Sequence, residues 1–237
     1  MNVSENDTGL TGWNLDVMAP IGPQLHRILR ERIIRNDLRA GSQISESEIG
    51  RQYDVSRQPV REAFIKLAGE GLIAIRPQRT TIIRKIEYQA VLDARFIREA
   101  IEADIVRLLA LSPDPVLIAD LRKQLHNQTR IAQNEPENFI QSDEFFHKSL
   151  ADGAGKIKVW GYIEGLKSQL NRVRHLSNGI FPVAEMIAQH QLVVDHIEKN
   201  DPDAAIAAMR FHLRRILEDL PNIREANPDL FDAPPGA

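Results

Sequence analysis

The sequence of 237 residues contains no cysteine, which excludes disulfide bonds, thiolate metal sites and thiol nucleophiles. The strong metal ligands that remain are His, Asp and Glu. No run of about 18 apolar residues is present, so a membrane-spanning helix is not expected. The N-terminus also lacks the basic start and apolar stretch of a signal peptide. We therefore expect a cytoplasmic protein that has no membrane partner.

The chain does have enough apolar sequence to form folded domains. Hydrophobic residues make up 43% of the chain and charged residues 27%, which excludes a disordered or fibrous protein and, at this length, favours two domains. The net charge of -3 is unevenly distributed: residues 21–85 carry 13 Lys and Arg against 7 Asp and Glu, and the segments on either side are acidic. This basic segment is the one expected to bind a polyanion.

Residues 20–86 have the pattern of three short helices followed by a hairpin. Apolar residues recur at helical spacing in three stretches, and the second stretch opens with a capping box at Ser45-x-x-Glu48. Two β-branched runs follow, at 72–75 and 81–83, and predict the hairpin. This order of elements is typical of a winged helix-turn-helix.

After residue 86 every strong hydrophobic period is helical, and breaks at Pro, Gly and Asn predict about six helices, the last ending at Pro221. The expected fold class is mainly α: an N-terminal winged helix-turn-helix of three helices plus a β-hairpin, joined to an all-helical antiparallel bundle. The expected organisation is a flexible tail at 1–19, the winged helix at 20–86, the helical domain at 87–221 and a C-terminal tail at 222–237.

Exposed polar side chains gather at the start of the third predicted helix, the part of a winged helix that enters the major groove. Arg can bind guanine O6 and N7 together, and Ser or Gln can reach phosphate or adenine. The alternative is a solvated helix start. The hairpin adds two arginines that could contact the minor groove or phosphates, or could be plain solubilising charge. The predicted DNA-binding residues are Ser56, Arg57, Gln58 and Arg61 in the helix and Arg76 and Arg79 in the hairpin.

The stretch SQISESEIGRQYDVSRQPVREAFIKLAGEGLIAIRPQRTTIIRKI resembles the DNA-binding domain of GntR-family bacterial transcription regulators. It contains VSRQPVREA where the family has close variants of VSRTPVREA. The resemblance implies that the arginines and the glutamine of this helix contact operator DNA and that Ser56 caps the helix. Ser47 stands where many members have a DNA-contacting Arg, and Thr80 stands where the wing tip often has Gly, so the resemblance does not imply an operator sequence.

Four polar residues interrupt the apolar faces of three predicted helices in the C-terminal half. Asp143 and His147 are four residues apart and project from one helix face. His190 interrupts the centre of the next apolar stripe, and His212 interrupts the stripe of the last helix. Burial of these groups is costly unless they meet one another, and a divalent metal would satisfy all four. The alternative is that each histidine is a hydrogen-bonded core residue.

The same region resembles the all-helical FCD effector domain of the FadR branch of the GntR family, through REAIEADIVRLLA, DEFFHKSLADGAG and QHQLVVDHIEKNDPDAAIAAMRFHL. In metal-binding members the ligands are the Asp and His of D-x-x-x-H, the His that opens the penultimate helix and the His before Leu in the last one. The resemblance places these ligands on Asp143, His147, His190 and His212. One carboxylate and three imidazoles suit Zn, Ni, Mn or Fe(II), and ligand type does not choose among them.

A small acidic metabolite is the expected effector, because a metal with five or six coordination positions leaves one or two open to a carboxylate. Arg98, Arg172 and Arg174 are the predicted effector-binding residues, since Arg pairs with an acid through two hydrogen bonds. For Arg98 the alternative is a salt bridge with Glu102 on the same helix. Arg172 and Arg174 cannot both face inward.

These features predict a homodimeric transcription regulator that binds a palindromic operator and responds to a carboxylic or sugar acid; by the resemblance it is a repressor. Two copies are expected because one small winged helix reads only a few base pairs. A metal-sensing regulator and a metalloenzyme with an appended winged helix remain as alternatives. No Glu or Ser beside the four ligands is placed by spacing as a base or nucleophile, so catalytic residues are not expected.

Overall fold

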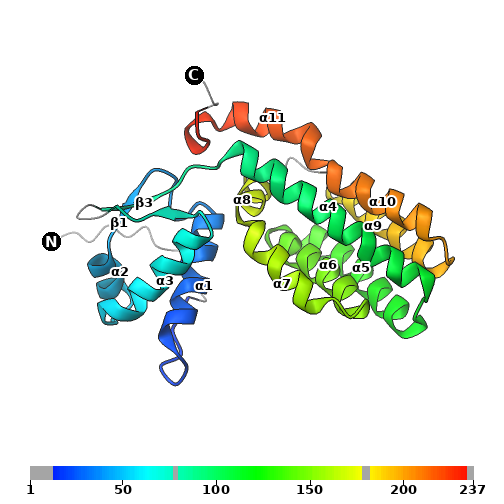
Figure 1. Cartoon of the computed structure of the whole chain (residues 1–237), viewed down its shortest axis with the longest axis horizontal. Helices are drawn as coiled ribbons and strands as arrows, with labels where there is room; N and C mark the ends of the chain where they lie inside the picture. The colour runs from blue at the N-terminus through cyan, green and yellow to red at the C-terminus, as the bar shows by residue number, and fades with distance from the viewer. Residues whose placement is uncertain (1–12, 77–79, 178–181, 234–237) are drawn as a thin grey trace. The chain divides into compact units, whose positions relative to one another are not determined.

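The computed structural model describes residues 13–76, 80–177 and 182–233 and divides into two compact units, the first ending at Arg84 and the second beginning at Lys85 (Figure 1). The predicted fold class is confirmed: the chain is mainly helical, with a winged helix-turn-helix followed by an all-helical unit. None of the described helices combines the length and the apolar character that a membrane-spanning helix requires.

The first unit contains three helices and a small antiparallel sheet in which the third strand lies between the other two. Its elements are α1 (Ile21–Ile34), β1 (Gln43–Ile44), α2 (Glu46–Gln52), α3 (Arg57–Gly69), β2 (Ile73–Ala74) and β3 (Thr81–Ile83). Strands β2 and β3 form the predicted hairpin. Strand β1 was not predicted, because two residues are too few for a hydrophobic pattern.

The apolar residues of the first unit pack into one core. Leu29 and Ile33 of α1 meet Val60 and Phe64 of α3, and all four are buried. Helix α2 begins at the predicted cap, where the hydroxyl of Ser45 accepts a hydrogen bond from the backbone of the third residue beyond it.

The segment before α1 belongs to this folded unit. Leu15 packs on the core, and the backbone N–H of Asp16 donates to the side chain of Gln24 at 2.8 Å. The expectation of a flexible tail at 1–19 is therefore wrong for residues 13–19, and its residues 1–12 lie outside the described part of the chain.

The described residues of the second unit form eight α-helices where about six were predicted. They are α4 (Tyr88–Leu111), α5 (Pro115–Asn134), α6 (Phe139–Gly153), α7 (Ile157–Leu166), α8 (Ser168–Leu176), α9 (Val183–Glu198), α10 (Pro202–Arg214) and α11 (Ile216–Ala226). The two additional breaks fall at Lys167 and Arg215. Neither position is Pro or Gly, so the sequence carries no signal for these breaks.

The C-terminal residues are folded beyond the predicted end of the last helix. Pro221 lies in the middle of α11, so the helix continues through the residue that was predicted to end it. A short 3-10 turn follows (Pro228–Leu230), and Leu230 and Phe231 are buried. The predicted C-terminal tail at 222–237 is therefore wrong as far as Asp232, which bonds to residue 86. Residues 234–237 are outside the described part.

The core of the second unit lies between α4, α5, α6, α9 and α10. Helix α10 packs on α4 and α9, and α5 packs on α6 and α9 (Figure 1). Val106, Leu121, Phe146, Val193 and Met209, one from each helix, are fully buried in this core. The packing turns the inner faces of α6, α9 and α10 toward one another.

Candidate metal centre and nucleic-acid interface

Four polar side chains meet where α6, α9 and α10 face one another. Asp143 and His147 come from α6, His190 from α9 and His212 from α10. One donor atom from each lies within 4.8 Å of the others, and all four residues are buried. The structure thus brings together the four residues that the sequence pattern selected.

The histidine rings point their Nε2 atoms at one another. The Nε2 atom of His212 lies 3.2 Å from that of His190 and 3.2 Å from that of His147. Asp143 completes the group, with Oδ1 3.4 Å from His190 Nε2 and Oδ2 3.9 Å from His147 Nε2. The four donor atoms therefore surround one point in the core.

The other nitrogen of each ring faces an oxygen acceptor. The Nδ1 atom of His147 lies 2.6 Å from Glu102 Oε2, and that of His190 lies 3.1 Å from Gln128 Oε1. The Nδ1 atom of His212 lies 3.0 Å from the Oε1 atom of a third residue, Gln189. A carboxylate or amide oxygen only accepts hydrogen bonds, so each Nδ1 must carry the proton.

The two amide groups are oriented by their own nitrogen atoms. Gln128 Nε2 donates to the backbone carbonyl of Ser142 at 3.3 Å, and Gln189 Nε2 donates to Glu185 Oε1 at 3.4 Å. Their oxygens are therefore the atoms that face the imidazoles. With Nδ1 protonated on all three rings, the three Nε2 atoms present lone pairs to the common point.

This arrangement fits a divalent cation. Three lone pairs and a carboxylate oxygen repel one another unless a positive charge lies between them. Ligands about 2.0–2.2 Å from a metal ion are roughly 3.0–3.4 Å from one another, in the range of the two Nε2 distances. The Oδ1 atom of Asp143 is also buried without a hydrogen-bond partner, whereas its Oδ2 accepts from Arg174. This unpaired oxygen and the three imidazole lone pairs are therefore available to coordinate one metal ion.

The charge states of these groups favour metal binding. Burial alone would raise the pKa of Asp143, but the charge of Arg174 opposes it, and that pKa is held well below its ordinary value. Burial lowers the pKa of His190 to about 3 and the pKa of His212 well below its ordinary value. An ionised aspartate and neutral imidazoles are the forms that coordinate a metal.

A cavity of about 70 Å³, counted as space for the centres of water-sized spheres, opens beside this cluster. Asp143 and His212 form part of its wall, and apolar side chains of α6, α8, α9, α10 and α11 form most of the rest. Since one water needs about 10–15 Å³ of such volume, the cavity has room for on the order of five water-sized groups. Four arginines also line it: Arg95, Arg98, Arg174 and Arg215.

Two of the three predicted effector-binding arginines line the cavity. Arg98 Nε donates to Glu102 Oε1 at 2.7 Å, so the expected alternative of a salt bridge within α4 is present. The Nη2 atom of Arg98 is nevertheless buried without a partner. Arg174 reaches the cavity from α8 while it bonds to Asp143.

Arg172 does not line the cavity, in agreement with the expectation that Arg172 and Arg174 cannot both face inward. It is buried elsewhere, where its Nη1 donates to Gln169 Oε1 at 3.3 Å and it is attracted by Asp232. Residues two apart on a helix point in different directions, which separates Arg172 from Arg174 on α8. Arg95 and Arg215 were missed; Arg95 lies three residues before Arg98 on the same face of α4, which was an available signal.

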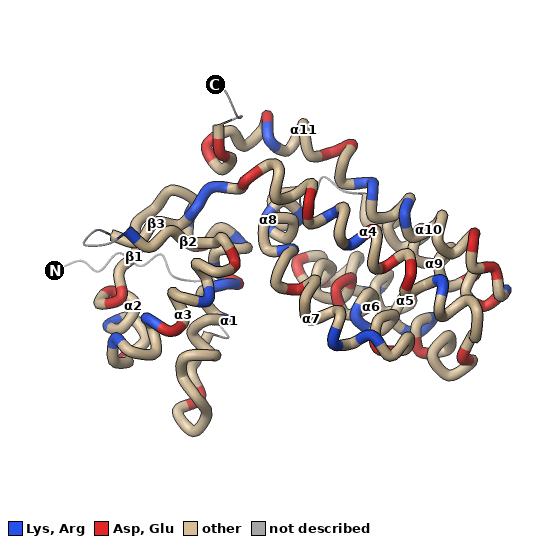
Figure 2. The backbone as a smooth tube through the Cα atoms, viewed as in Figure 1, with Lys and Arg blue, Asp and Glu red and all other residues tan. Residues whose placement is uncertain are grey.

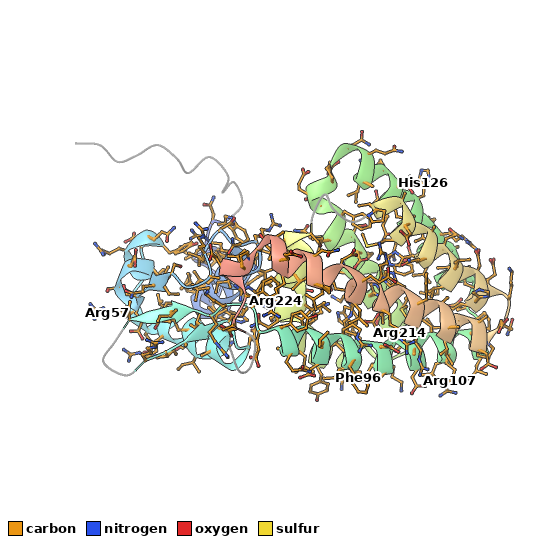
Figure 3. All side chains as sticks on the ribbon, turned by 90° about the horizontal axis from the view of Figure 1, so that it is seen from above. Arg57, Phe96, Arg107, His126, Arg214 and Arg224 are labelled. Carbon is orange, nitrogen blue, oxygen red and sulfur yellow. The ribbon has the colours of Figure 1, made fainter. Side chains whose placement is uncertain are left out.

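The predicted DNA-binding residues form the exposed start of α3. Ser56 occupies the N-cap position without a side-chain cap hydrogen bond, and Arg57, Gln58 and Arg61 are exposed. Figure 2 shows that basic residues of this unit lie on α2 and α3 among acidic ones, and Figure 3 shows Arg57 extending outward from the start of α3.

Two of these side chains have partners within the unit. Gln58 donates to Glu62 at 3.1 Å. Arg61 donates to both carboxylate oxygens of Glu46, each at 3.0 Å. In the hairpin Arg76 is exposed, and the prediction for Arg79 falls outside the described residues.

Known proteins share both units. Residues 93–215 match the FCD domain, and residues 23–83 match bacterial regulatory proteins of the gntR family. The HTH-type transcriptional repressor RspR of Escherichia coli K12 is 38% identical over 219 residues, covering 92% of this chain and 96% of that protein. A regulator encoded in an unstable DNA locus of Streptomyces ambofaciens is 35% identical over 205 residues, 86% of each chain. The solved structure of E. coli McbR/YncC has a TM-score of 0.73 at 17% identity and covers 86% of this chain and 99% of its own.

Proposed function

The chain belongs to the GntR family of bacterial transcription regulators and carries an FCD domain, and from this premise we propose that it is a metal-containing repressor controlled by a small acid. The family and the curated relatives are transcription regulators and not enzymes. The proposal extends this to a divalent metal at Asp143, His147, His190 and His212, an acidic effector in the adjacent cavity and a palindromic operator bound by two copies of the chain.

One observation carries the metal assignment: three Nε2 lone pairs and the unpaired Oδ1 of Asp143 face one point in a buried site. A divalent cation bound there supplies positive charge that can attract a carboxylate. The acceptors on the Nδ1 side hold each imidazole in the tautomer and the orientation that a metal needs. Zn, Ni, Mn and Fe(II) all accept this ligand set.

The cavity favours a small carboxylic or sugar acid as the effector. Its apolar wall would make a carboxylate costly to bury without compensating charge. The unpaired Nη2 of Arg98 can donate to such a group, and Arg174 and the metal add positive charge on the same side. An effector that fits must be small, because the cavity volume is only about 70 Å³.

DNA binding is assigned to the exposed start of α3. Arg57 and Arg61 are exposed at the start of α3 with Ser56 and Gln58 beside them, and a recognition helix approaches base edges with this part. Arg76 in the hairpin is exposed and can contact the minor groove or phosphates. The effect of an acid on operator affinity would be a coupling free energy between the two sites. Repression is proposed because the curated relative from E. coli K12 is named a repressor.

Titration of candidate carboxylic and sugar acids into metal-loaded and chelator-treated protein, paired with operator binding by both forms, tests this function. We expect chelation to weaken acid binding much more than it weakens operator binding in the absence of acid. Equal acid affinity with and without metal would leave the metal a structural role. Loss of operator binding on chelation alone would instead identify a metal sensor, and turnover of an acid would identify a metalloenzyme.

A further inference from the structure

The recognition helix α3 has a carboxylate partner on the face proposed for DNA. Glu46 opens α2, and its two oxygens accept from Nε and Nη2 of Arg61, both at 3.0 Å. A guanidinium has a second pair of donors, on Nη1 and Nη2, and this pair can still bind a base edge. The Arg61 side chain is 58% exposed and that of Glu46 is 28% exposed, so the pair lies at the surface.

A carboxylate at this position has two opposite effects on DNA binding. Its negative charge repels phosphates and weakens binding to every duplex. Its hydrogen bonds also restrict the orientation of Arg61, which reduces the entropy that the side chain would lose on binding a base. The hydrogen bond from Arg61 and its charge lower the pKa of Glu46, so the carboxylate stays ionised.

We propose that Glu46 determines specificity by holding Arg61 in the orientation that reads a base instead of a phosphate. The proposal rests on the proposed role of Arg61 in operator binding. Glu46 acts through Arg61 and is therefore a positioning residue.

Glu46→Gln tests this proposal, because the two effects of the carboxylate change affinity in opposite directions for different duplexes. The preferred sequence is first selected by the wild type from a library of randomised duplexes. We expect the variant to bind random-sequence duplex more tightly than the wild type and the selected duplex more weakly. The ratio of the two affinities should fall by about tenfold, the range for loss of one good base contact.

Glu48→Gln is the matched control, because it removes the same charge from an exposed position on the same helix. It should leave the ratio of affinities unchanged. If Glu46→Gln strengthens binding to the selected and the random duplex equally, the carboxylate acts only through charge and the proposal is overturned. Arg61→Ala separates this failure from failure of the premise: unchanged affinity for the selected duplex in that variant would remove the recognition role itself.

A second, independent observation concerns the C-terminal residues. They lie alongside residue 86, in the segment that follows β3 and precedes α4. The backbone N–H of Ile86 donates to the carbonyl of Leu230 at 2.8 Å, and the N–H of Asp232 donates to the carbonyl of Ile86 at 3.0 Å. Ile86 and Phe231 form a parallel β-bridge, and both side chains are buried. We call residues 228–232 the C-terminal strap.

The strap is also tied to the helix that reaches the metal centre. Asp232 attracts Arg172 of α8, and α11, which leads into the strap, packs on α8. Arg224 of α11, labelled in Figure 3, lies over the ring of Tyr88 at the start of α4, 5.2 Å from its centre. Two residues beyond Arg172, Arg174 bonds to the candidate metal ligand Asp143. A continuous series of contacts therefore joins the metal centre, α8, α11, the strap and Ile86.

We infer that the C-terminal strap passes the state of the metal centre to the segment that joins the two units. This inference rests on the proposed metal centre. With the metal bound, Asp143 and Arg174 hold α8 in place, and α8, through α11 that packs on it, holds the strap against Ile86. Without the strap, the segment at Ile86 is expected to lose its order whatever the state of the metal centre.

Hydrogen exchange of the Ile86 amide measures this directly, because its proton is bonded to a strap carbonyl. In zinc-loaded wild type we expect the amide to be protected, and chelation should lower its protection by about tenfold or more. A chain truncated after Asn227 should show low protection in both forms. A chain truncated after Ala233, which keeps the strap, is the matched control and should behave as the wild type.

Three outcomes would overturn the inference. The first is an Ile86 amide that exchanges freely in the loaded wild type. The second is protection that survives truncation after Asn227, with the amide of Val106 in the core of α4 showing that the unit is folded. The third is protection that chelation leaves unchanged although elemental analysis shows that metal was bound and removed. If elemental analysis finds no bound metal, the proposed metal centre has failed, and the inference fails with it.

Discussion

Replacement of Gln128 by methionine is expected to weaken metal binding although no proposed ligand is changed. Gln128 is fully buried in α5, where its Oε1 accepts from His190 Nδ1 at 3.1 Å and its Nε2 donates to the carbonyl of Ser142 at 3.3 Å. Methionine has a similar length but offers no comparable acceptor. The Nδ1–H of His190 then has no partner, and the ring is no longer held with Nε2 toward the other ligands.

The size of this effect follows from the loss of one of three acceptors on the Nδ1 side. Removal of such a partner costs about 10–100-fold in metal affinity, or about 1.4–2.7 kcal/mol. At a free metal concentration about 100 times the wild-type Kd, metal stabilises the wild type by about 2.7 kcal/mol, and a tenfold weaker variant by about 1.4 kcal/mol. The difference in Tm between metal-loaded and metal-free protein should therefore narrow by about 3–5 °C in the variant.

Gln124→Met is the matched control. Gln124 lies one turn earlier on α5 and is also buried, but its Nε2 donates to Asp120 and Ser149 and not to a ligand of the proposed centre. Competition of each variant with a chelating dye for Zn²⁺ gives the affinities. If Gln128→Met and Gln124→Met bind Zn²⁺ equally tightly, the acceptors do not orient the imidazoles and the reasoning is refuted.

Three further predictions concern the ligands, the recognition helix and pH. His190→Ala or His212→Ala should reduce metal content below one per chain and remove the rise in Tm that metal gives the wild type, as measured by elemental analysis and thermal unfolding. Arg57→Ala should lose about 1–3 kcal/mol of base discrimination in mobility-shift titrations, whereas Lys66→Ala, in the last turn of α3, should leave base preference unchanged. Burial lowers the pKa of His190 from 6.5 to about 3, so in metal-free protein the unfolded state takes up the proton first. Above pH 6.5 the free energy of unfolding contains the full contribution of this group. It should fall as the pH drops from 6.5 toward 3, by up to about 1.4 kcal/mol per pH unit in denaturant unfolding. A free energy of unfolding that does not change over this range would contradict the assignment.

The winged helix could be predicted from the sequence because its signals are local. The capping box at Ser45 and the apolar periods of α1 and α3 depend only on neighbouring residues, and the structure has these elements. Strand β1 depends instead on pairing with β3, a partner nearly forty residues away. A strand of two residues carries no pattern that shows such a pairing.

In the helical unit, some helix boundaries depend on tertiary contacts and could not be predicted from neighbouring residues. Helices α7 and α8 separate at Lys167, whose ammonium group is buried against Glu144 and lies 4.1 Å from the centre of the Trp160 ring. These contacts come from tertiary packing, and Lys has good helix propensity, so the sequence favours one longer helix there. Pro221 gave the opposite error, because a proline in a helix interior usually ends or kinks the helix, yet α11 continues through Pro221 to Ala226.

The four proposed metal ligands could be found because a charged or polar residue inside an apolar stripe is visible in sequence. The same signal applied to α4 and α5 would have found Glu102 and Gln128, which also interrupt buried faces. The choice between Arg172 and Arg174 required the structure. Sequence places both on one helix, and only packing decides which side faces the cavity.

The metal content and ligand set of the purified full-length chain test the central claim most directly. Protein prepared without a metal-affinity column is analysed for its elements and, after loading with Zn²⁺, by X-ray absorption at the metal edge. The account predicts one metal per chain, coordinated by three imidazole nitrogens and at least one carboxylate oxygen, with the imidazole signal reduced in His212→Ala. A folded chain that binds no metal, or one that binds it without imidazole ligands, would contradict the account.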